Sequence, residues 1–154
     1  MLDGQMRMLI DPVVGRWADR LVPMGWTANE MTLLGLVLGL GSAVMIAAGW
    51  PGLALVPLLV SRVADGLDGA IARVTRKTDL GGFFDIVADF LFYGAVPMAF
   101  AWANPGANAI PAAFLLLTFY VNGASFLAYA VLAERHGMAT AARVVRHYLP
   151  LVRL

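Results

Sequence analysis

The sequence contains no cysteine, and only 14% of its 154 residues carry a charged side chain. The missing cysteine excludes a disulfide framework, thiol catalysis and a cysteine-based metal site. The low charge is equally informative, because about 25% of residues are charged in an average soluble domain. Hydrophobic residues make up 60% of the chain. These proportions predict an integral membrane protein, for which the useful count is the number of spans of about 20 apolar residues each.

The first thirty residues lack the uninterrupted apolar core of a signal peptide, because acidic side chains divide the region. We therefore expect the segment 1–30 to remain in the mature protein. Between residues 8 and 21 apolar side chains recur at helical spacing, with Arg16, Asp19 and Arg20 on the opposite side. This pattern predicts a helix that lies in the membrane interface. A polar leader with a chance apolar stripe is the alternative interpretation.

Four apolar stretches follow, and the fold class they predict is all-α, a polytopic membrane bundle of about four transmembrane helices preceded by the interfacial helix. The expected spans cover about residues 32–50, 53–73, 83–102 and 109–132. In the first span Gly35 and Gly39 form a GxxxG pair, which lets another helix approach closely. We therefore expect a transmembrane core over residues 31–133 and a basic cytoplasmic tail over residues 134–154.

The positions of the Lys and Arg residues predict how the chain crosses the membrane. They cluster before the first span, between the second and third, and after the fourth, whereas the loops around Pro51 and Pro105 contain none. By the positive-inside rule, both termini and the middle loop lie in the cytoplasm. In a bacterium this integral membrane protein would therefore reside in the inner, or plasma, membrane.

Four aspartates lie within the second and third predicted spans, where an ionisable side chain is costly and indicates a functional site by default. Asp65 and Asp68 share one face of a helix, and Asp85 and Asp89 share one face of the next. The segment between the two spans is short enough to make these helices antiparallel neighbours. The two carboxylate pairs are therefore expected to face each other near the cytoplasmic surface and to surround a metal.

Carboxylate ligands without cysteine, and with both histidines far away in sequence, favour a hard cation such as Mg²⁺ or Mn²⁺ over zinc. Four carboxylates carry enough charge for two ions. The same helical face holds small residues, which leave room for a bulky ligand, and a guanidinium, whose planar fork suits phosphate. These residues are Gly69, Ala72 and Arg73. The combination predicts phosphate chemistry at a two-metal site.

Residues 65–89 resemble the signature of the CDP-alcohol phosphatidyltransferases, D-x2-D-G-x2-A-R-x(7–8)-G-x3-D-x3-D. All eight fixed positions of that signature match: Asp65, Asp68, Gly69, Ala72, Arg73, Gly81, Asp85 and Asp89. Agreement at every position within one hairpin is far more specific than a lone short motif. Asn29 and Thr32, at the start of the first span, also resemble that family, although Ala28 replaces its usual proline.

The resemblance implies a membrane enzyme of phospholipid biosynthesis. Such an enzyme transfers a phosphatidyl group from a CDP-linked lipid, such as CDP-diacylglycerol, to an alcohol and releases CMP. The implied cofactors are two divalent cations, Mg²⁺ or Mn²⁺, and the implied metal ligands are Asp65, Asp68, Asp85 and Asp89. Asp89 would also be the catalytic general base. The implied nucleotide and substrate residues are Gly69, Ala72, Arg73, Gly81, Asn29 and Thr32.

The expected partners are the CDP-linked donor, the alcohol acceptor, membrane lipids and a second copy of the chain in a homodimer, and no nucleic acid is expected. The acceptor itself is open, because glycerol phosphate, inositol phosphate and serine all react with the same donor. Members of this family usually have six spans, whereas the segment after residue 138 is too short and too basic for another. We therefore expect the last two spans to be missing. The chain would then be a truncated product, a shorter homologue completed by oligomerisation, or an inactive relative that acts as a scaffold.

Other interpretations of the aspartates remain. They would line a cation path in an ion carrier, or they would be structural acids neutralised by Arg62, Arg73 and Arg76. Arg62 lies one turn before Asp65 on the same face, so we interpret it as a structural counter-charge rather than a substrate ligand.

Overall fold

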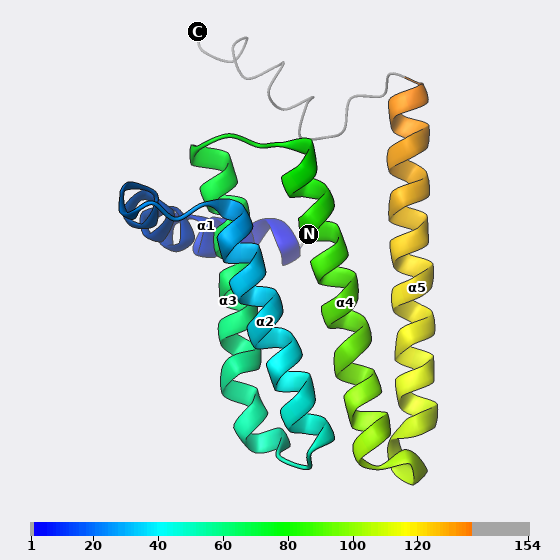
Figure 1. Ribbon diagram of the computed structural model, residues 1–154. Coiled ribbons are helices and arrows are strands. Elements are labelled where there is room, and N and C mark those ends of the chain that lie inside the picture. Colours follow the sequence, from blue (N-terminus) through cyan, green and yellow to red (C-terminus); the bar gives the residue numbers. More distant parts are fainter. Residues whose placement is uncertain (1, 137–154) are drawn as a thin grey trace, which may run out of the picture. The chain divides into compact units, whose positions relative to one another are not determined.

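The computed structural model describes residues 2–136, which form five α-helices and one short 3-10 helix (Figure 1). The elements are α1 (Leu2–Leu21), η1 (Val22–Met24), α2 (Ala28–Ala47), α3 (Pro51–Val74), α4 (Asp79–Ala103) and α5 (Pro105–Arg135). No strand occurs within these described residues, so the all-α prediction is confirmed. The predicted basic tail lies outside the described residues from residue 137 onward.

Within residues 2–136, three helical segments are long and apolar enough to cross a membrane, namely Ala28–Ala47, Asp79–Ala103 and Pro105–Ala133. The remaining expected span corresponds to α3, whose 24 residues extend about 36 Å at a rise of about 1.5 Å per residue. This length is sufficient for a hydrocarbon core of about 30 Å. The composition of α3 is less apolar because its sequence includes Arg62, Asp65, Asp68 and Arg73.

Large apolar side chains point away from the helix contacts. Val44 of α2 and Val56 of α3 are each 68% exposed, and Met98 of α4 is 64% exposed. Extensive exposed apolar surface is typical of a membrane-facing protein, because lipid tails rather than water surround it.

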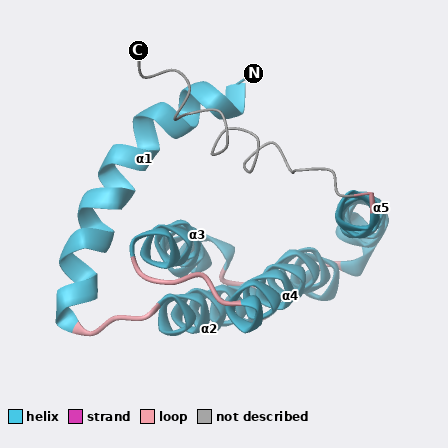
Figure 2. Ribbon diagram, turned by 90° about the horizontal axis from the view of Figure 1, so that it is seen from above, coloured by secondary structure: helices cyan, strands magenta, loops and turns pink. Residues whose placement is uncertain are grey.

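The described residues form two compact units, one ending at Ala113 and the other starting at Phe114. The first unit contains α1 to α4 and the start of α5, and it holds every residue predicted for the site. Within it α2 packs against both α3 and α4 (Figures 1 and 2). The sequence predicted that α3 and α4 would be antiparallel neighbours. They are antiparallel, but in the described residues each packs mainly on α2, and long side chains near the aspartates connect them.

Glycine and serine allow the three helices to come close. Gly35 and Gly39 are buried in α2, and a Cβ atom at Gly39 would lie 2.6 Å from Cδ2 of Phe92 and 2.9 Å from Oγ of Ser61. A hydrogen fits in this space and a methyl group does not. The buried Ser61 hydroxyl donates to the carbonyl oxygen of Gly35 at 2.7 Å. The close approach predicted from the GxxxG pair is therefore confirmed.

Threonine caps determine where α2 and α4 begin. The Thr27 hydroxyl accepts from the Glu30 amide at 3.3 Å, and the Glu30 carboxylate accepts from the Thr27 amide at 2.9 Å, which completes a capping box. The Thr78 hydroxyl accepts from the Gly81 amide at 3.0 Å. Both caps lie at the end of the bundle where α3 finishes, so these helix termini surround one region (Figure 1).

Helix α1 differs in direction from the bundle. In Figure 2 it is seen from the side, whereas α2, α3 and α4 are seen end-on, so α1 lies across them. It packs against α3, and its Ala18 is fully buried in a cluster with Met31 and Ile71. Val13 and Trp17 remain about half exposed, at 47% and 53%. This arrangement is consistent with the predicted interfacial helix, which begins at Leu2 rather than near residue 8.

Candidate functional site

A cavity of about 500 Å³ opens where α2 and α4 begin and α3 ends. All six residues predicted to bind nucleotide or substrate line it: Asn29, Thr32, Gly69, Ala72, Arg73 and Gly81. Two predicted metal ligands, Asp68 and Asp85, line it as well, and Arg76 and Lys77 enter from the connection between α3 and α4. The cavity therefore combines carboxylates with cationic side chains, an arrangement suited to a metal-bound phosphate.

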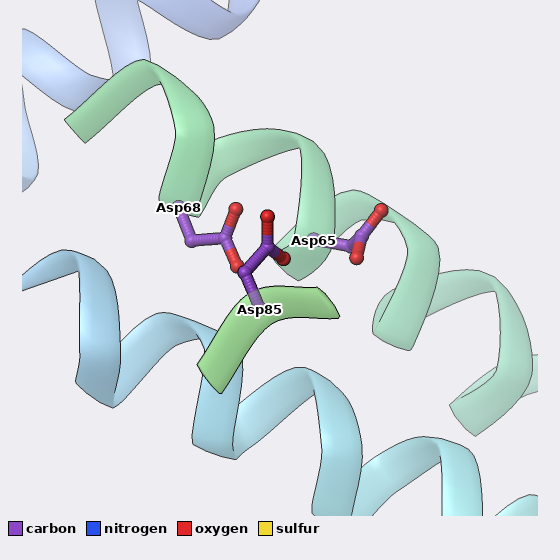
Figure 3. A group of neighbouring side chains, drawn as sticks. All are labelled: Asp65, Asp68 and Asp85. Carbon is purple, nitrogen blue, oxygen red and sulfur yellow. The ribbon is translucent and has the colours of Figure 1, made fainter. Parts of the chain in front are cut away.

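Three of the four predicted metal ligands converge, and we call Asp65, Asp68 and Asp85 the carboxylate triad. Asp65 and Asp68 project from α3 and Asp85 from α4 (Figure 3), and one oxygen from each lies within 4.8 Å of the others. Asp68 is buried, and the other two are partly exposed. Two oxygens bound to one Mg²⁺ or Ca²⁺ lie at most about 4 to 5 Å apart, twice the metal–oxygen distance. The triad therefore fits a hard cation with little movement.

Thr32 of α2 orients one member of the triad. Its hydroxyl lies 2.6 Å from Oδ2 of Asp68 and 3.0 Å from the carbonyl oxygen of Ala28. A hydroxyl donates one hydrogen at a time, and the short bond to a carboxylate is the stronger of the two. Hydrogen bonds of this kind orient metal ligands. Thr32 was predicted as a substrate residue, and the structure adds a direct bond to a predicted metal ligand.

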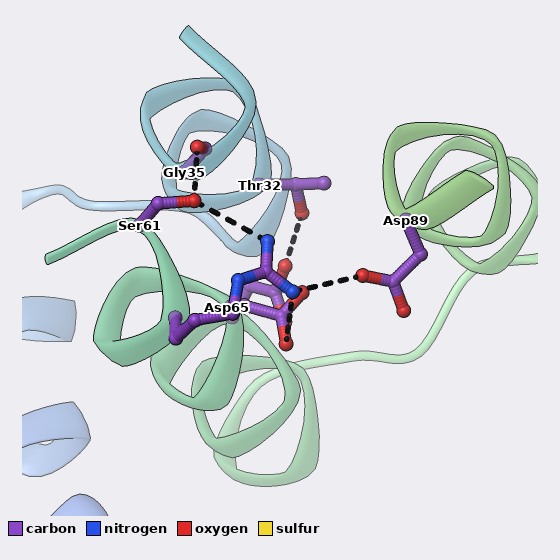
Figure 4. Close-up of polar contacts among 7 residues, drawn as sticks. Thr32, Gly35, Ser61, Asp65 and Asp89 are labelled. Atoms are coloured by element: carbon purple, nitrogen blue, oxygen red, sulfur yellow. Dashed lines mark hydrogen bonds and ion pairs between the residues drawn. The ribbon is translucent and has the colours of Figure 1, made fainter. Parts of the chain in front are cut away.

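Asp89, the fourth predicted ligand, is outside the triad. Its Oδ1 lies 3.3 Å from Nη1 of Arg62, and the same nitrogen lies 3.6 Å from Oδ2 of Asp65. Figure 4 shows Asp89 on α4 facing Ser61 and Asp65 of α3, with polar contacts in the space between the two helices. Arg62 is thus a counter-charge to two aspartates, as its position one turn before Asp65 predicted.

The signature glycine of α3 leaves its backbone open to the cavity. A Cβ atom at Gly69 would meet only Nη1 of Arg73, at 3.6 Å. Arg73, one turn later, is exposed and extends its guanidinium back toward Gly69. A phosphate bound by this guanidinium would therefore lie close to uncovered helix backbone.

Gly81 is constrained by its neighbours. A Cβ atom there would lie 2.9 Å from Oγ1 of Thr78 and 3.0 Å from Oδ1 of Asn29. The hydroxyl that caps α4 and an amide from α2 both occupy this space. Gly81 therefore lets the start of α2 lie against the start of α4, in addition to lining the cavity.

Several cavity residues were not selected from the sequence. Trp26, Thr78 and Gly82 line the cavity, and Phe92 lies beneath the Arg62 guanidinium, with its ring centroid 3.6 Å from Cζ. A capping box at Thr27 and Glu30 marks the N-terminus of α2, so it would have placed the preceding residue, Trp26, at that helix end. Phe92 is three residues after Asp89, so helical spacing alone would have placed it on the same face.

Comparisons with known proteins identify the family of this chain. The family model for CDP-alcohol phosphatidyltransferase matches residues 26–150. The chain is 43% identical over 136 residues to the Inner membrane protein YnjF of Escherichia coli (strain K12), an alignment that covers 88% of this chain and 66% of that protein. It is 29% identical over 82 residues to Phosphatidylcholine synthase of Borreliella burgdorferi, which covers 50% of this chain and 35% of that protein.

A third relative is the Bifunctional IPC transferase and DIPP synthase of Aquifex aeolicus, with 37% identity over 78 residues, or 47% of this chain and 18% of that protein. No solved structure matches the chain. The chain thus spans about two thirds of the first of these relatives and much less of the other two. Because the family match includes the whole signature and most of this membrane protein, the chain belongs to the CDP-alcohol phosphatidyltransferase family.

Proposed function

We propose that the chain is a membrane phosphotransferase that moves a phosphatidyl group from a CDP-linked lipid to an alcohol and releases CMP. The observation that carries this proposal is the meeting at one cavity of two members of the carboxylate triad, Asp68 and Asp85, with Arg73 and the open backbone at Gly69. Family membership supports this class of reaction. Two relatives are named as a synthase and as a transferase, which is consistent with it.

The proposed donor is CDP-diacylglycerol, and the proposed pathway is phospholipid biosynthesis. The cavity lies at one end of a bundle whose helices expose apolar side chains to lipid. A lipid-borne substrate can therefore keep its tails in the bilayer while its nucleotide enters the cavity. A volume of about 500 Å³ is within the usual range for a small-molecule site, about 300 to 1,000 Å³.

The proposed division of labour follows the positions of the side chains. Asp65, Asp68 and Asp85 would hold two divalent cations, Mg²⁺ or Mn²⁺, with Asp89 as the fourth and least coordinated ligand. When bound, the cations neutralise charge on the diphosphate and on the leaving CMP. Arg73 binds the diphosphate, and the small residues Gly69 and Ala72 let the nucleotide reach the helix.

Asp89 is the proposed general base, which accepts the proton of the alcohol as its oxygen attacks phosphorus. The phosphorus–oxygen bond to CMP then breaks, and CMP leaves with that oxygen. Metal coordination lowers the basicity of a carboxylate, so the useful base is the least coordinated of the four. The position of Asp89 outside the triad supports this assignment.

The decisive experiment measures CMP release by the full chain in lipid nanodiscs with CDP-diacylglycerol and Mg²⁺. Glycerol phosphate, inositol phosphate and serine are supplied one at a time. We expect release with one of these acceptors, loss of release when EDTA removes the cation, and no release by Asp68→Asn. If the chain binds the CDP-lipid but releases no CMP with any acceptor, a catalytically inactive, binding-only role replaces the enzyme.

Two further predictions from the sequence remain proposals. The distribution of Lys and Arg supports cytoplasmic termini. The homodimer is tested by light scattering of the purified chain, which should give twice the mass of 16.5 kDa after subtraction of bound lipid and detergent.

A further inference from the structure

Arg62 occupies a position that the signature does not specify. It lies on α3 one turn before Asp65, its side chain is 27% exposed, and its Nη1 contacts both Asp65 and Asp89. It thus places one positive charge between a triad member and the carboxylate outside the triad.

Uncharged groups hold this guanidinium in place. Its Cζ lies 3.6 Å from the ring centroid of Phe92, whose side chain is buried, and this is a close cation–π contact. Its Nη2 donates to the Ser61 hydroxyl at 3.3 Å, and that hydroxyl is bonded to Gly35 of α2. The Tyr93 ring packs edge-on against Phe92, with centroids 5.5 Å apart. Groups on three helices therefore support Arg62 in addition to the carboxylates.

The fit of the guanidinium is incomplete in one respect. Nε of Arg62 is buried without a hydrogen-bond partner, and an unpaired buried donor costs free energy. The aromatic ring and the Ser61 hydroxyl therefore hold this cation together with the two carboxylates. A positive charge held at that point opposes the binding of further cations to the aspartates beside it.

We propose that Arg62 is a positioning residue that orients Asp89 beside the carboxylate triad and limits the affinity of the four aspartates for divalent cations. The inference rests on the proposed function, because it takes the triad to be the cation site. A purely structural Arg62 predicts the opposite, since its loss would disorder the carboxylates and weaken cation binding.

The test measures Mn²⁺ binding to the full chain in nanodiscs from the electron paramagnetic resonance signal of free Mn²⁺. Arg62→Met removes the charge and keeps an unbranched side chain, and we expect it to bind Mn²⁺ about ten-fold more tightly or better, as the loss of a nearby unit charge requires. Arg62→Lys keeps the charge, so its affinity should remain close to that of the wild type. Arg16→Met is the matched control, because Arg16 bonds to the Pro12 carbonyl within α1.

Turnover gives a second measurement. Without Arg62, Asp89 loses the charged partner that orients it, so CMP release by Arg62→Met should fall although cation binding improves. Arg62→Lys should restore part of it. A structural role would lower both quantities together.

Two outcomes separate this inference from the proposed function. If Asp68→Asn loses Mn²⁺ binding but Arg62→Met binds it no more tightly than the wild type, the inference is wrong and the cation site stands. If Asp68→Asn and the wild type bind Mn²⁺ equally, the cation site is wrong and the inference falls with it.

Should Arg62→Met fail to fold, Arg62→Gln provides the neutral variant and keeps a donor for Ser61. Its melting temperature, followed by circular dichroism, should rise more on addition of Mn²⁺ than that of the wild type. An equal or smaller rise overturns the inference.

Discussion

Asp89 differs from the other signature aspartates in its surroundings, because it pairs with Arg62 and lies outside the carboxylate triad. Asp89→Asn keeps the shape of the side chain and one oxygen but removes the basicity. We expect turnover to fall by about two to four orders of magnitude, the usual contribution of a general base. Binding of the CDP-lipid should change much less. The two quantities are measured by CMP release and by calorimetry, and unchanged turnover would place the base elsewhere.

Gly69 and Gly66 provide a matched pair on α3. A leucine at Gly69 enters the cavity beside Arg73, whereas Gly66 does not line the cavity and has nothing within 4 Å of its Cβ position. We expect Gly69→Leu to weaken CMP binding at least about ten-fold, equivalent to roughly 1.4 kcal/mol, and Gly66→Leu to leave it unchanged. Calorimetry with CMP measures both, and equal affinities would remove the nucleotide from this face of the helix.

At the scale of helices, α2 is the element on which α3 and α4 pack, and its small residues determine how closely they approach. Gly39→Ala would bring a methyl group against Phe92 and Ser61, which also position Arg62. We expect a loss of about 1 to 3 kcal/mol in stability, the usual cost of overpacking. Thermal unfolding in detergent measures the change.

Gly41→Ala on the same helix is the control for that variant. Gly41 is exposed with nothing within 4 Å of its Cβ position, so alanine should be neutral or stabilise the helix by up to about 1 kcal/mol. Equal stability of the two variants would mean that the helices can separate at Gly39 at little cost.

At the scale of the whole molecule, the membrane orientation is open to a direct test, because the chain contains no cysteine. Thr75→Cys lies between α3 and α4, and Gly106→Cys lies just after α4, so the two positions mark opposite ends of that helix. The positive-inside rule predicts that an impermeant maleimide labels Thr75→Cys from the cytoplasmic side and Gly106→Cys from the other side. Labelling of both from one side would contradict the passage of α4 through the membrane.

The sequence by itself determined the elements of this protein and the composition of its site. Each helix has its own apolar pattern, so the predicted spans 53–73 and 83–102 correspond to α3 (Pro51–Val74) and α4 (Asp79–Ala103). The earlier start of α4 follows from the Thr78 cap, a local signal that hydropathy does not detect. Helical spacing also sufficed to place Asp65 and Asp68 on one face of α3, and Asp85 and Asp89 on one face of α4.

The tertiary structure alone decided which side chains each of these carboxylates contacts. Spacing places Asp85 and Asp89 on one face of α4, but Asp85 enters the triad and Asp89 pairs with Arg62. The same holds for Thr32, which reaches Asp68 from 36 residues away in the chain. Such contacts depend on the rotation and separation of packed helices, which the buried glycines and Phe92 determine through van der Waals contact, and no periodicity within a single helix contains that information.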